Sequence, residues 1–178
     1  MQEISTVLKN GGIGIIATDT IYGIVGQALN SKPVERIYNI KKRTPAKPFI
    51  ILISKIEDVL QFGIGIDSSL TKKLDNYWPG PVSIILDCPG DTFTYLHRGT
   101  HTLAFRLPAK DELRALIRRT GPLVAPSANP EGFPPATNIT EAKQYFADNV
   151  NFYESGQVSD TPSKIIRIIG DTIEIIRA

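Results

Sequence analysis

Short apolar runs recur along this chain and are separated by segments with helical spacing. The runs are rich in β-branched residues and are bounded by glycine, proline or polar clusters, a pattern typical of buried strands. Strands are predicted at 13–17, 23–28, 49–53, 82–86, 103–107, 123–125, 165–169 and 172–176. Gly170 and Asp171 between the last two predict a closing hairpin.

Amphipathic segments fill the intervals between these strands. Helices are predicted at 3–10, 31–42, 67–78, 111–119 and 140–146, with a further helix beginning near Ser54. Ser31 is a candidate N-cap, and Ser54 with Glu57 matches a capping box. The interleaving of strands and helices predicts an α/β fold, with a single domain over 1–178 and a twisted mixed sheet flanked by helices.

The composition narrows the class of protein. The chain has 178 residues, of which 42% are hydrophobic and 21% charged, and this suits one soluble globular domain. Its net charge of +2 is too small for nucleic-acid binding over the whole surface, so any basic function must be local. The single cysteine, Cys88, excludes an intrachain disulfide. An early Glu3 and the lack of a long apolar run predict no signal peptide and no membrane span, so we expect a cytoplasmic protein.

Two segments far apart in the sequence carry the strongest candidate chemistry. Residues 41–47 form a basic cluster at a predicted helix end, and residues 125–130 place a hydroxyl and an amide on a proline-bounded loop after a strand. Lysine and arginine neutralise phosphate oxygens, while Ser127 and Asn129 can fix a sugar or phosphate through neutral hydrogen bonds. Either segment alone is weak evidence, because a short basic run is more often a solvated surface. Together they predict a nucleotide site.

Other patterns in the sequence are weaker. Gly12 and Gly14 precede a strand instead of following one, so they do not indicate a Rossmann fingerprint. His97 and His101 are four residues apart, but no carboxylate or thiol motif supports them, and no metal site is predicted. Arg106 lies inside a predicted strand and has two interpretations. It is either a solvated position on an edge strand or a fixed guanidinium that binds a small carboxylate.

Several short motifs occur in order: Thr-Asp-Thr-Ile-Tyr-Gly at 18–23, Lys-x-Arg at 41–43, Trp-Pro-Gly-Pro at 78–81, Ala-Phe-Arg-Leu-Pro at 104–108 and Ser-x-Asn at 127–129. This set resembles the motifs of the YrdC/Sua5 family, the threonylcarbamoyl-adenylate synthases. The resemblance runs over nearly the whole chain. It implies a YrdC-like fold with a nucleotide-binding cleft, in the short form that has no additional C-terminal domain.

The resemblance also implies which residues bind the substrates. For ATP it implies Lys41, Arg43, Lys47, Thr102, Ser127, Asn129, Thr137 and Arg177. Lys41 and Arg43 would be the catalytic residues, neutralising charge on the triphosphate and on the leaving pyrophosphate. For L-threonine it implies Thr20, Arg106 and Ser163. Mg²⁺ would be carried by the ATP phosphates, because these motifs contain no carboxylate cluster.

The activity that the resemblance implies is a nucleotidyl transfer. L-threonine, bicarbonate (or CO2) and ATP would become threonylcarbamoyl-AMP and pyrophosphate, for the modification of adenosine 37 in tRNA to N6-threonylcarbamoyladenosine. The implied partners are tRNA or downstream threonylcarbamoyl-transferase proteins, and no membrane. Leu52 stands where longer relatives carry a histidine near threonine, so that contact is missing or supplied elsewhere.

Two alternative functions stay open. The chain could be an RNA-binding module that uses residues 41–47 with Arg114, Arg118 and Arg119 as a basic surface. It could also resemble carbamoyl-transferring proteins of metallocentre assembly. That second alternative is disfavoured, because such proteins embed this domain in a much longer chain with zinc-finger and acylphosphatase parts.

Overall fold

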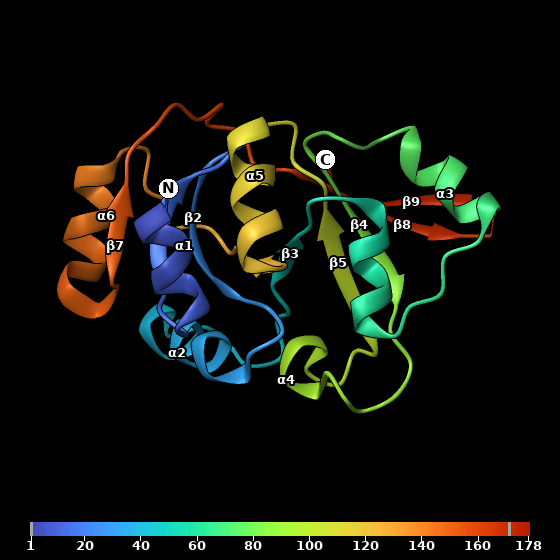
Figure 1. Ribbon diagram of the computed structural model, residues 1–178, viewed down its shortest axis with the longest axis horizontal. Helices are drawn as coiled ribbons and strands as arrows, with labels where there is room; N and C mark the ends of the chain where they lie inside the picture. The colour runs from blue at the N-terminus through green and yellow to red at the C-terminus, as the bar shows by residue number, and fades with distance from the viewer. Residues whose placement is uncertain (1, 171) are drawn as a thin grey trace.

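One mixed sheet runs through the computed structural model, which describes residues 2–170 and 172–178. Within these residues nine strands lie in the order β7-β1-β2-β6-β3-β5-β4-β8-β9 (Figure 1). The strands are β1 Gly14–Ala17, β2 Tyr22–Gln27, β3 Ile50–Leu52, β4 Val82–Asp87, β5 Thr102–Arg106, β6 Leu123–Val124, β7 Phe152–Glu154, β8 Lys164–Ile169 and β9 Thr172–Arg177. β3 runs parallel to β5, and β1 runs antiparallel to β2. The predicted α/β fold with a mixed sheet is confirmed.

Helices cover both faces of this sheet. They are α1 Gln2–Lys9, α2 Ser31–Lys41, α3 Ser68–Asp75, α4 Thr94–His97, α5 Asp111–Thr120 and α6 Ile139–Phe146, with short 3-10 helices η1 Ile56–Phe62 and η2 Ala147–Asn149. α1 and α5 lie side by side (Figure 1) and bury Leu8 and Leu116 in one core cluster. α2 and α6 bury Ile37 and Phe146 in a second, larger cluster. In the described part of the chain, no helix is both long and apolar enough to cross a membrane.

The central strands are buried on both sides. In β1, Ile15 belongs to the larger core cluster and Ile16 to the smaller one, and in β2 Ile24 and Val25 divide in the same way. Successive strand residues point to opposite faces, so a strand covered on both faces needs apolar residues at every position. This requirement explains why the strands read as continuous apolar runs in the sequence.

Two predicted helix caps lie elsewhere in the structure. Helix α2 begins at Ser31, but its N-cap is Asn30, whose side chain accepts from a backbone N–H at 3.1 Å. The helix predicted near Ser54 is the 3-10 helix η1. Asp58, not Glu57, closes its first turn by accepting from the backbone N–H and the hydroxyl of Ser54 at 2.8 and 2.7 Å. Neighbouring polar residues compete for these positions, and spacing alone does not choose between them.

The boundaries of the other predicted elements lie within two residues of the prediction, except at the end of α3, whereas three short elements, α4, η2 and β7, were not predicted. Helix α3 ends at Asp75 and not at 78, because Pro79 and Gly80 follow and neither favours a continuing helix. Strand β7 was not predicted, since it has only three residues and pairs in parallel with the distant β1. The closing hairpin is confirmed by the antiparallel pairing of β8 with β9, although Asp171 itself lies outside the described residues.

Phe105 tests whether the larger core cluster stabilises the fold. Its side chain is 0% exposed and its ring centroid lies 5.1 Å from that of Phe62. We expect Phe105→Ala to lower the free energy of unfolding by about 3–5 kcal/mol, through lost burial and the cavity left behind. Leu60→Ala is the control, because Leu60 is 53% exposed and should change stability little. Equal effects of the two changes in urea denaturation would contradict the packing described here.

Candidate functional site

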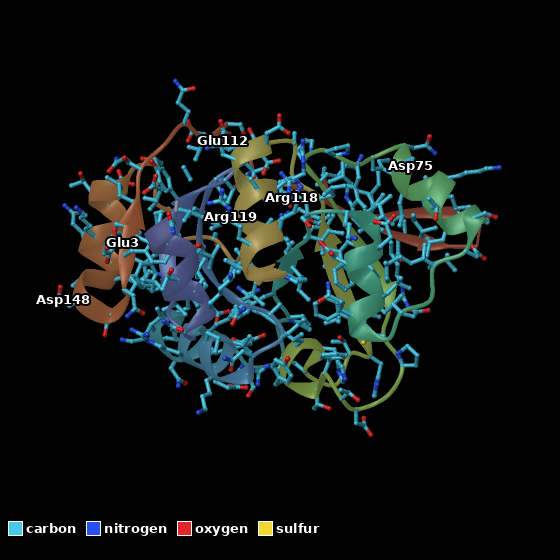
Figure 2. The ribbon with its side chains drawn as sticks, in the orientation of Figure 1. Glu3, Asp75, Glu112, Arg118, Arg119 and Asp148 are labelled. Carbon is cyan, nitrogen blue, oxygen red and sulfur yellow. The ribbon has the colours of Figure 1, made fainter. Side chains whose placement is uncertain are left out.

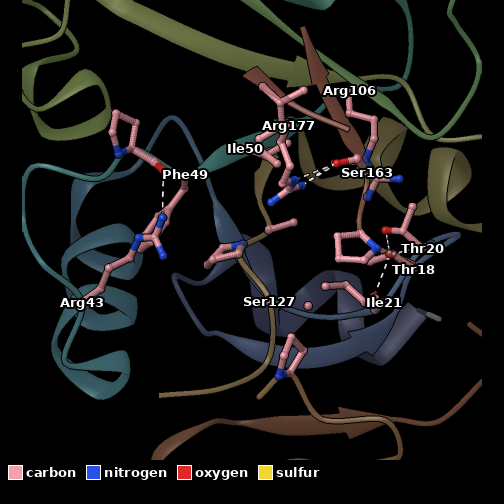
Figure 3. A pocket seen from close by; sticks show the side chains of 17 residues that line it. Thr18, Thr20, Ile21, Arg43, Phe49, Ile50, Arg106, Ser127, Ser163 and Arg177 are labelled. Atoms are coloured by element: carbon pink, nitrogen blue, oxygen red, sulfur yellow. Dashed lines mark hydrogen bonds between the residues drawn. The ribbon is translucent and has the colours of Figure 1, made fainter. Parts of the chain in front are cut away.

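A pocket of about 210 Å³ opens where several loops meet the sheet. Figure 3 shows Arg43 on one side of it, Arg106, Thr20 and Ser163 on the opposite side, and Arg177 between them. The lining residues are Thr18, Thr20, Ile21, Gly23, Arg43, Pro48, Phe49, Ile50, Arg106, Ala125, Pro126, Ser127, Pro135, Pro162, Ser163, Ile165 and Arg177. Three guanidinium groups and no carboxylate line this pocket, which therefore suits anionic ligands.

Arg43 is held by the turn that follows α2. Its Nε donates to the carbonyl of Lys47 at 3.1 Å and its Nη2 to the carbonyl of Pro48 at 3.4 Å. Its guanidinium also lies 5.4 Å from the ring centroid of Phe49. Burial lowers the pKa of Arg43, although the side chain stays charged at neutral pH. The pocket thus contains a cation whose position is set by the carbonyls of its own turn.

Arg106 is buried at the end of β5, with 3% exposure. Because β5 lies between β3 and β4, the interpretation of Arg106 as a solvated position on an edge strand is wrong. Its Nη1 forms an ion pair with Asp19, whose other oxygen accepts from the Ala109 N–H at 3.0 Å. The Nε of Arg106 is buried without a hydrogen-bond partner in the described structure. A buried donor without a partner is unfavourable, so a ligand oxygen could satisfy it.

Arg177 reaches the pocket from the last residue of β9. Its Nε and Nη2 donate to the carbonyl of Ser163 at 3.0 and 2.5 Å, and the Ser163 hydroxyl lies 2.9 Å from that of Ser83. Burial, and then the nearby charge of Arg106, lower the pKa of Arg177. The side chain of Arg177 is therefore held at the pocket by a main-chain carbonyl.

The turn between β1 and β2 supplies the hydroxyls of the pocket. Thr18 Oγ1 donates to the carbonyl of Ile21 at 2.7 Å and lies 3.0 Å from Thr20 Oγ1. The carbonyl of Thr20 accepts from the backbone N–H groups of Ser159 and Asp160, at 2.8 and 3.1 Å. The turn is thus fixed by bonds within it and by bonds from residues 159 and 160, and Thr20 lies on the same side of the pocket as Arg106 in Figure 3.

Lys41 does not line the pocket, although the sequence predicted a catalytic role for it. Its side chain is 1% exposed, and its Nζ donates to the carbonyls of Ser127 and Asn129, each at 2.5 Å. These bonds join the end of α2 to the loop after β6. Burial lowers the pKa of Lys41 to about 7. A neutral amine still donates two hydrogens, so the joint does not depend on the charge.

Four other predicted residues also lie outside the pocket lining: Lys47, Thr102, Asn129 and Thr137. Thr102 begins β5, at the opposite end of the strand from Arg106, and its hydroxyl lies 3.2 Å from that of Thr100. Lys47 is exposed and forms an ion pair with Glu131. The structure therefore does not bring Thr102 to the other predicted residues, and it gives Lys47 an internal partner.

Asn129 and Thr137 are likewise engaged within the chain. The Nδ2 of Asn129 donates to the carbonyls of Pro130 and Phe133 at 3.1 and 2.6 Å. The backbone N–H of Thr137 donates to Glu141 at 2.9 Å, and its hydroxyl lies 3.0 Å from the same carboxylate oxygen. These two residues shape the segment after Ser127. Of the eleven predicted site residues, the pocket lining brings together Thr20, Arg43, Arg106, Ser127, Ser163 and Arg177.

Sequence reasoning missed two carboxylates that orient the basic groups. Asp19 holds Arg106, and Glu131 holds Lys47 and the backbone N–H of Thr44. Asp19 lies inside the Thr-Asp-Thr-Ile-Tyr-Gly motif at 18–23, so the sequence does contain a signal for it. Glu131 carries no local signal, because its partners are more than eighty residues away in sequence.

The described residues offer no group of three acidic, histidine or cysteine side chains that could hold a metal ion. His97 and His101 stack with ring centroids 4.8 Å apart. The Nδ1 of His97 accepts from the Gly99 N–H at 3.1 Å, and its Nε2 lies 3.2 Å from the Gly90 carbonyl oxygen. Both ring nitrogens of His97 thus lie within hydrogen-bond distance of backbone groups of nearby glycines.

Comparison with known proteins identifies the family. The sequence profile of Sua5/YciO/YrdC proteins, described as "Telomere recombination", matches residues 6–178. The chain belongs to this family. A family member from Marinobacter nauticus, named threonylcarbamoyl-AMP synthase, is 31% identical over 92% of this chain and 88% of its own length. A threonylcarbamoyl-AMP synthase of Bacillus subtilis is also 31% identical, but the match spans only 47% of that protein.

Solved structures of the family share the fold. The Sua5 protein of P. abyssi in complex with L-threonine superposes with a TM-score of 0.90 and 25% identity. It is matched over 99% of this chain and 53% of its own length, so the present chain spans about half of that relative. E. coli YciO superposes with a TM-score of 0.85 at 20% identity, which supports the fold alone.

The buried amine of Lys41 should contribute to stability, and its contribution should depend on pH. Lys41→Met leaves two buried carbonyls without their donor, and we expect the free energy of unfolding to fall by about 2 kcal/mol. Because the native pKa of about 7 lies below the ordinary 10.5, the unfolded chain binds more protons between these values. The stability of the native protein relative to the variant should therefore rise as pH increases from 7 towards 10.5.

Lys42→Met is the matched control for this measurement, because Lys42 is exposed and neighbours Lys41 in sequence. Urea denaturation at several pH values between 6 and about 10 would give both quantities. Unchanged stability in Lys41→Met would contradict the role of Lys41 as a joint between α2 and the loop.

Proposed function

We infer that this chain is a threonylcarbamoyl-AMP synthase. The observation that carries this conclusion is that one pocket has Arg43 on one side and Arg106 on the opposite side, with Arg177 between them and no carboxylate in its lining. Such a pocket can hold one anion at each end. The family relatives named threonylcarbamoyl-AMP synthase support this assignment over an RNA-binding module.

The amino acid would bind at the Arg106 end of the pocket. The unpartnered Nε of Arg106 can donate to a carboxylate oxygen, and burial strengthens such a bond. The hydroxyls of Thr20 and Ser163 lie on the same side in Figure 3 and can position the rest of a threonine. The P. abyssi Sua5 structure with L-threonine supports threonine as the ligand.

The nucleotide phosphates would bind at the Arg43 end. Arg43 provides fixed positive charge, and Ser127 provides a hydroxyl on the loop that Lys41 holds in place. Arg177, between the two ends, can approach the carboxylate as well as the phosphate. In this proposal Lys47, Thr102 and Thr137 contact ATP only if their internal partners change, whereas the Oδ1 of Asn129 has no partner in the described structure.

The proposed reaction places few demands on acid–base groups of the protein. The threonine amine attacks CO2 and loses a proton, forming a carbamate. A carbamate oxygen then bonds to the α-phosphorus of ATP as the bond to the β-phosphate oxygen breaks, releasing pyrophosphate. Arg43 and Arg177 would stabilise the charge that develops on the phosphates. Mg²⁺ would travel with the phosphates, because no carboxylate lines the pocket.

Because it would transfer the adenylyl group of ATP, the enzyme would be a nucleotidyltransferase. Its product would pass to a threonylcarbamoyl-transferring protein for the modification of tRNA. A cytoplasmic location is part of this proposal.

The RNA-binding alternative loses part of its basis, because Lys41 is buried and Arg114 donates to the carbonyl of Pro108 and pairs with Asp111. Arg118 and Arg119 remain exposed on α5 but share that helix with the acidic Glu112 (Figure 2).

The first test is pyrophosphate release from ATP. We expect release that requires both L-threonine and bicarbonate, and a loss of at least about 100-fold in kcat/KM for Arg43→Gln, since it removes a phosphate cation. Arg118→Gln, an exposed arginine on α5, should keep full activity. Release that proceeds equally without threonine would contradict the proposed function.

Arg106 should determine the affinity for threonine. We expect Arg106→Lys to raise the KM for threonine more than about tenfold and to change the KM for ATP little. The single ammonium group of a lysine cannot pair with Asp19 and also form a bidentate contact with the carboxylate of threonine. Steady-state kinetics with each substrate varied would measure both values. A rise confined to the KM for ATP would reverse the proposed orientation of the substrates.

A further inference from the structure

Glu131 joins two segments that border the pocket. We call residues 42–48 the basic turn and residues 125–136 the polar loop. The backbone N–H of Glu131 donates to the carbonyl of Lys41 at 2.8 Å. Its carboxylate accepts from the backbone N–H of Thr44 and from the Nζ of Lys47, and lies 3.0 Å from the Thr44 hydroxyl. One residue of the polar loop thus holds both the start and the end of the basic turn.

The basic turn in turn determines where Arg43 points. The carbonyls that accept from the Arg43 guanidinium belong to Lys47 and Pro48, both in this turn. The turn also closes on itself, because the Lys47 N–H donates to the carbonyl of Thr44 at 3.1 Å. The carboxylate of Glu131 therefore contacts both residues of this closing bond, and any movement of the turn would carry the carbonyls that hold Arg43.

The carboxylate of Glu131 remains charged at neutral pH. The hydrogen bond from Lys47, followed by that from the Thr44 N–H, lowers the pKa of Glu131 to about 2. Its side chain is 26% exposed, whereas that of Lys47 is 56% exposed. The pair thus lies at the surface beside the pocket, where water competes with a simple ion pair. What distinguishes this contact is the additional bond to a backbone N–H, which fixes the main chain as well as the side chain.

We propose that Glu131 is a positioning residue for the nucleotide: it holds the basic turn against the polar loop so that Arg43 faces the phosphate end of the pocket. This inference rests on the proposed function. Glu131 would act through Arg43, without any contact of its own with ATP. A different account would make Glu131 a competitor, an internal anion on donors that phosphate would otherwise occupy. The two accounts predict opposite changes in nucleotide affinity.

The experiment compares Glu131→Ala and Glu131→Gln with the native chain. Alanine removes every side-chain acceptor, whereas glutamine keeps one oxygen for the Thr44 N–H and loses the negative charge and the oxygen that accepts from Lys47. We expect Glu131→Ala to raise the KM for ATP about tenfold, the equivalent of one charge-assisted hydrogen bond, with the KM for threonine unchanged. Glu131→Gln should restore much of the loss. Glu57→Ala, at an exposed position on η1, is the control.

Equilibrium binding of a non-hydrolysable ATP analogue, measured by calorimetry on the same variants, separates this inference from the proposed function. If the native chain binds the analogue but releases no pyrophosphate, the function fails while the role of Glu131 is still tested by affinity. Weaker binding in Glu131→Ala supports the inference. Unchanged or tighter binding overturns it, and so does an equal rise in both KM values, which would indicate a general loss of structure.

Discussion

The pocket depends on the bonds from Lys41 Nζ to two backbone carbonyls of the loop after β6. Ser127 and Asn129 lie 86 and 88 residues beyond Lys41 in sequence, and no other described side chain donates to both carbonyls. Because hydrogen bonds constrain both length and angle, an amine bonded to two carbonyls fixes how far the loop lies from the helix and how the loop is oriented. The end of α2, two residues before Arg43, is thereby aligned with the loop that carries Ser127. Lys41, which the sequence predicts to bind phosphate, thus also joins two segments of the fold.

Each end of the pocket has a cation that is held in place by the protein. At the Arg106 end, the ion pair with Asp19 orients Arg106 and offsets the cost of burying its charge, since an isolated buried charge would be strongly unfavourable. At the Arg43 end, main-chain carbonyls of its own turn hold Arg43, and Glu131 holds that turn. Cations that are fixed before a ligand arrives need no reorganisation when charge develops during a reaction. A reaction between two anionic substrates suits such a site.

The sequence predicted the strands well because most of them are covered on both faces, and the resulting apolar runs are hard to confuse with other patterns. It also placed Arg106 and Ser127 in the site through their motifs. The predicted role of Lys41 at the phosphates stays a prediction, and its bonds to two distant carbonyls could not be foreseen because a motif reports residue types and not side-chain directions. Glu131 and the strand β7 were missed for one reason: both depend on partners more than eighty residues away, which no local spacing reveals. Pairings of this kind require the fold itself.

The central claim is that this pocket joins threonine, CO2 and the adenylyl group of ATP in a single molecule. Mass spectrometry of the reaction with ¹³C-bicarbonate tests it most directly. The account predicts an adenylate that contains threonine and carries the ¹³C label, formed only when threonine, bicarbonate and ATP are all present. An adenylate of threonine without the label, or no adenylate while ATP is consumed, would contradict it.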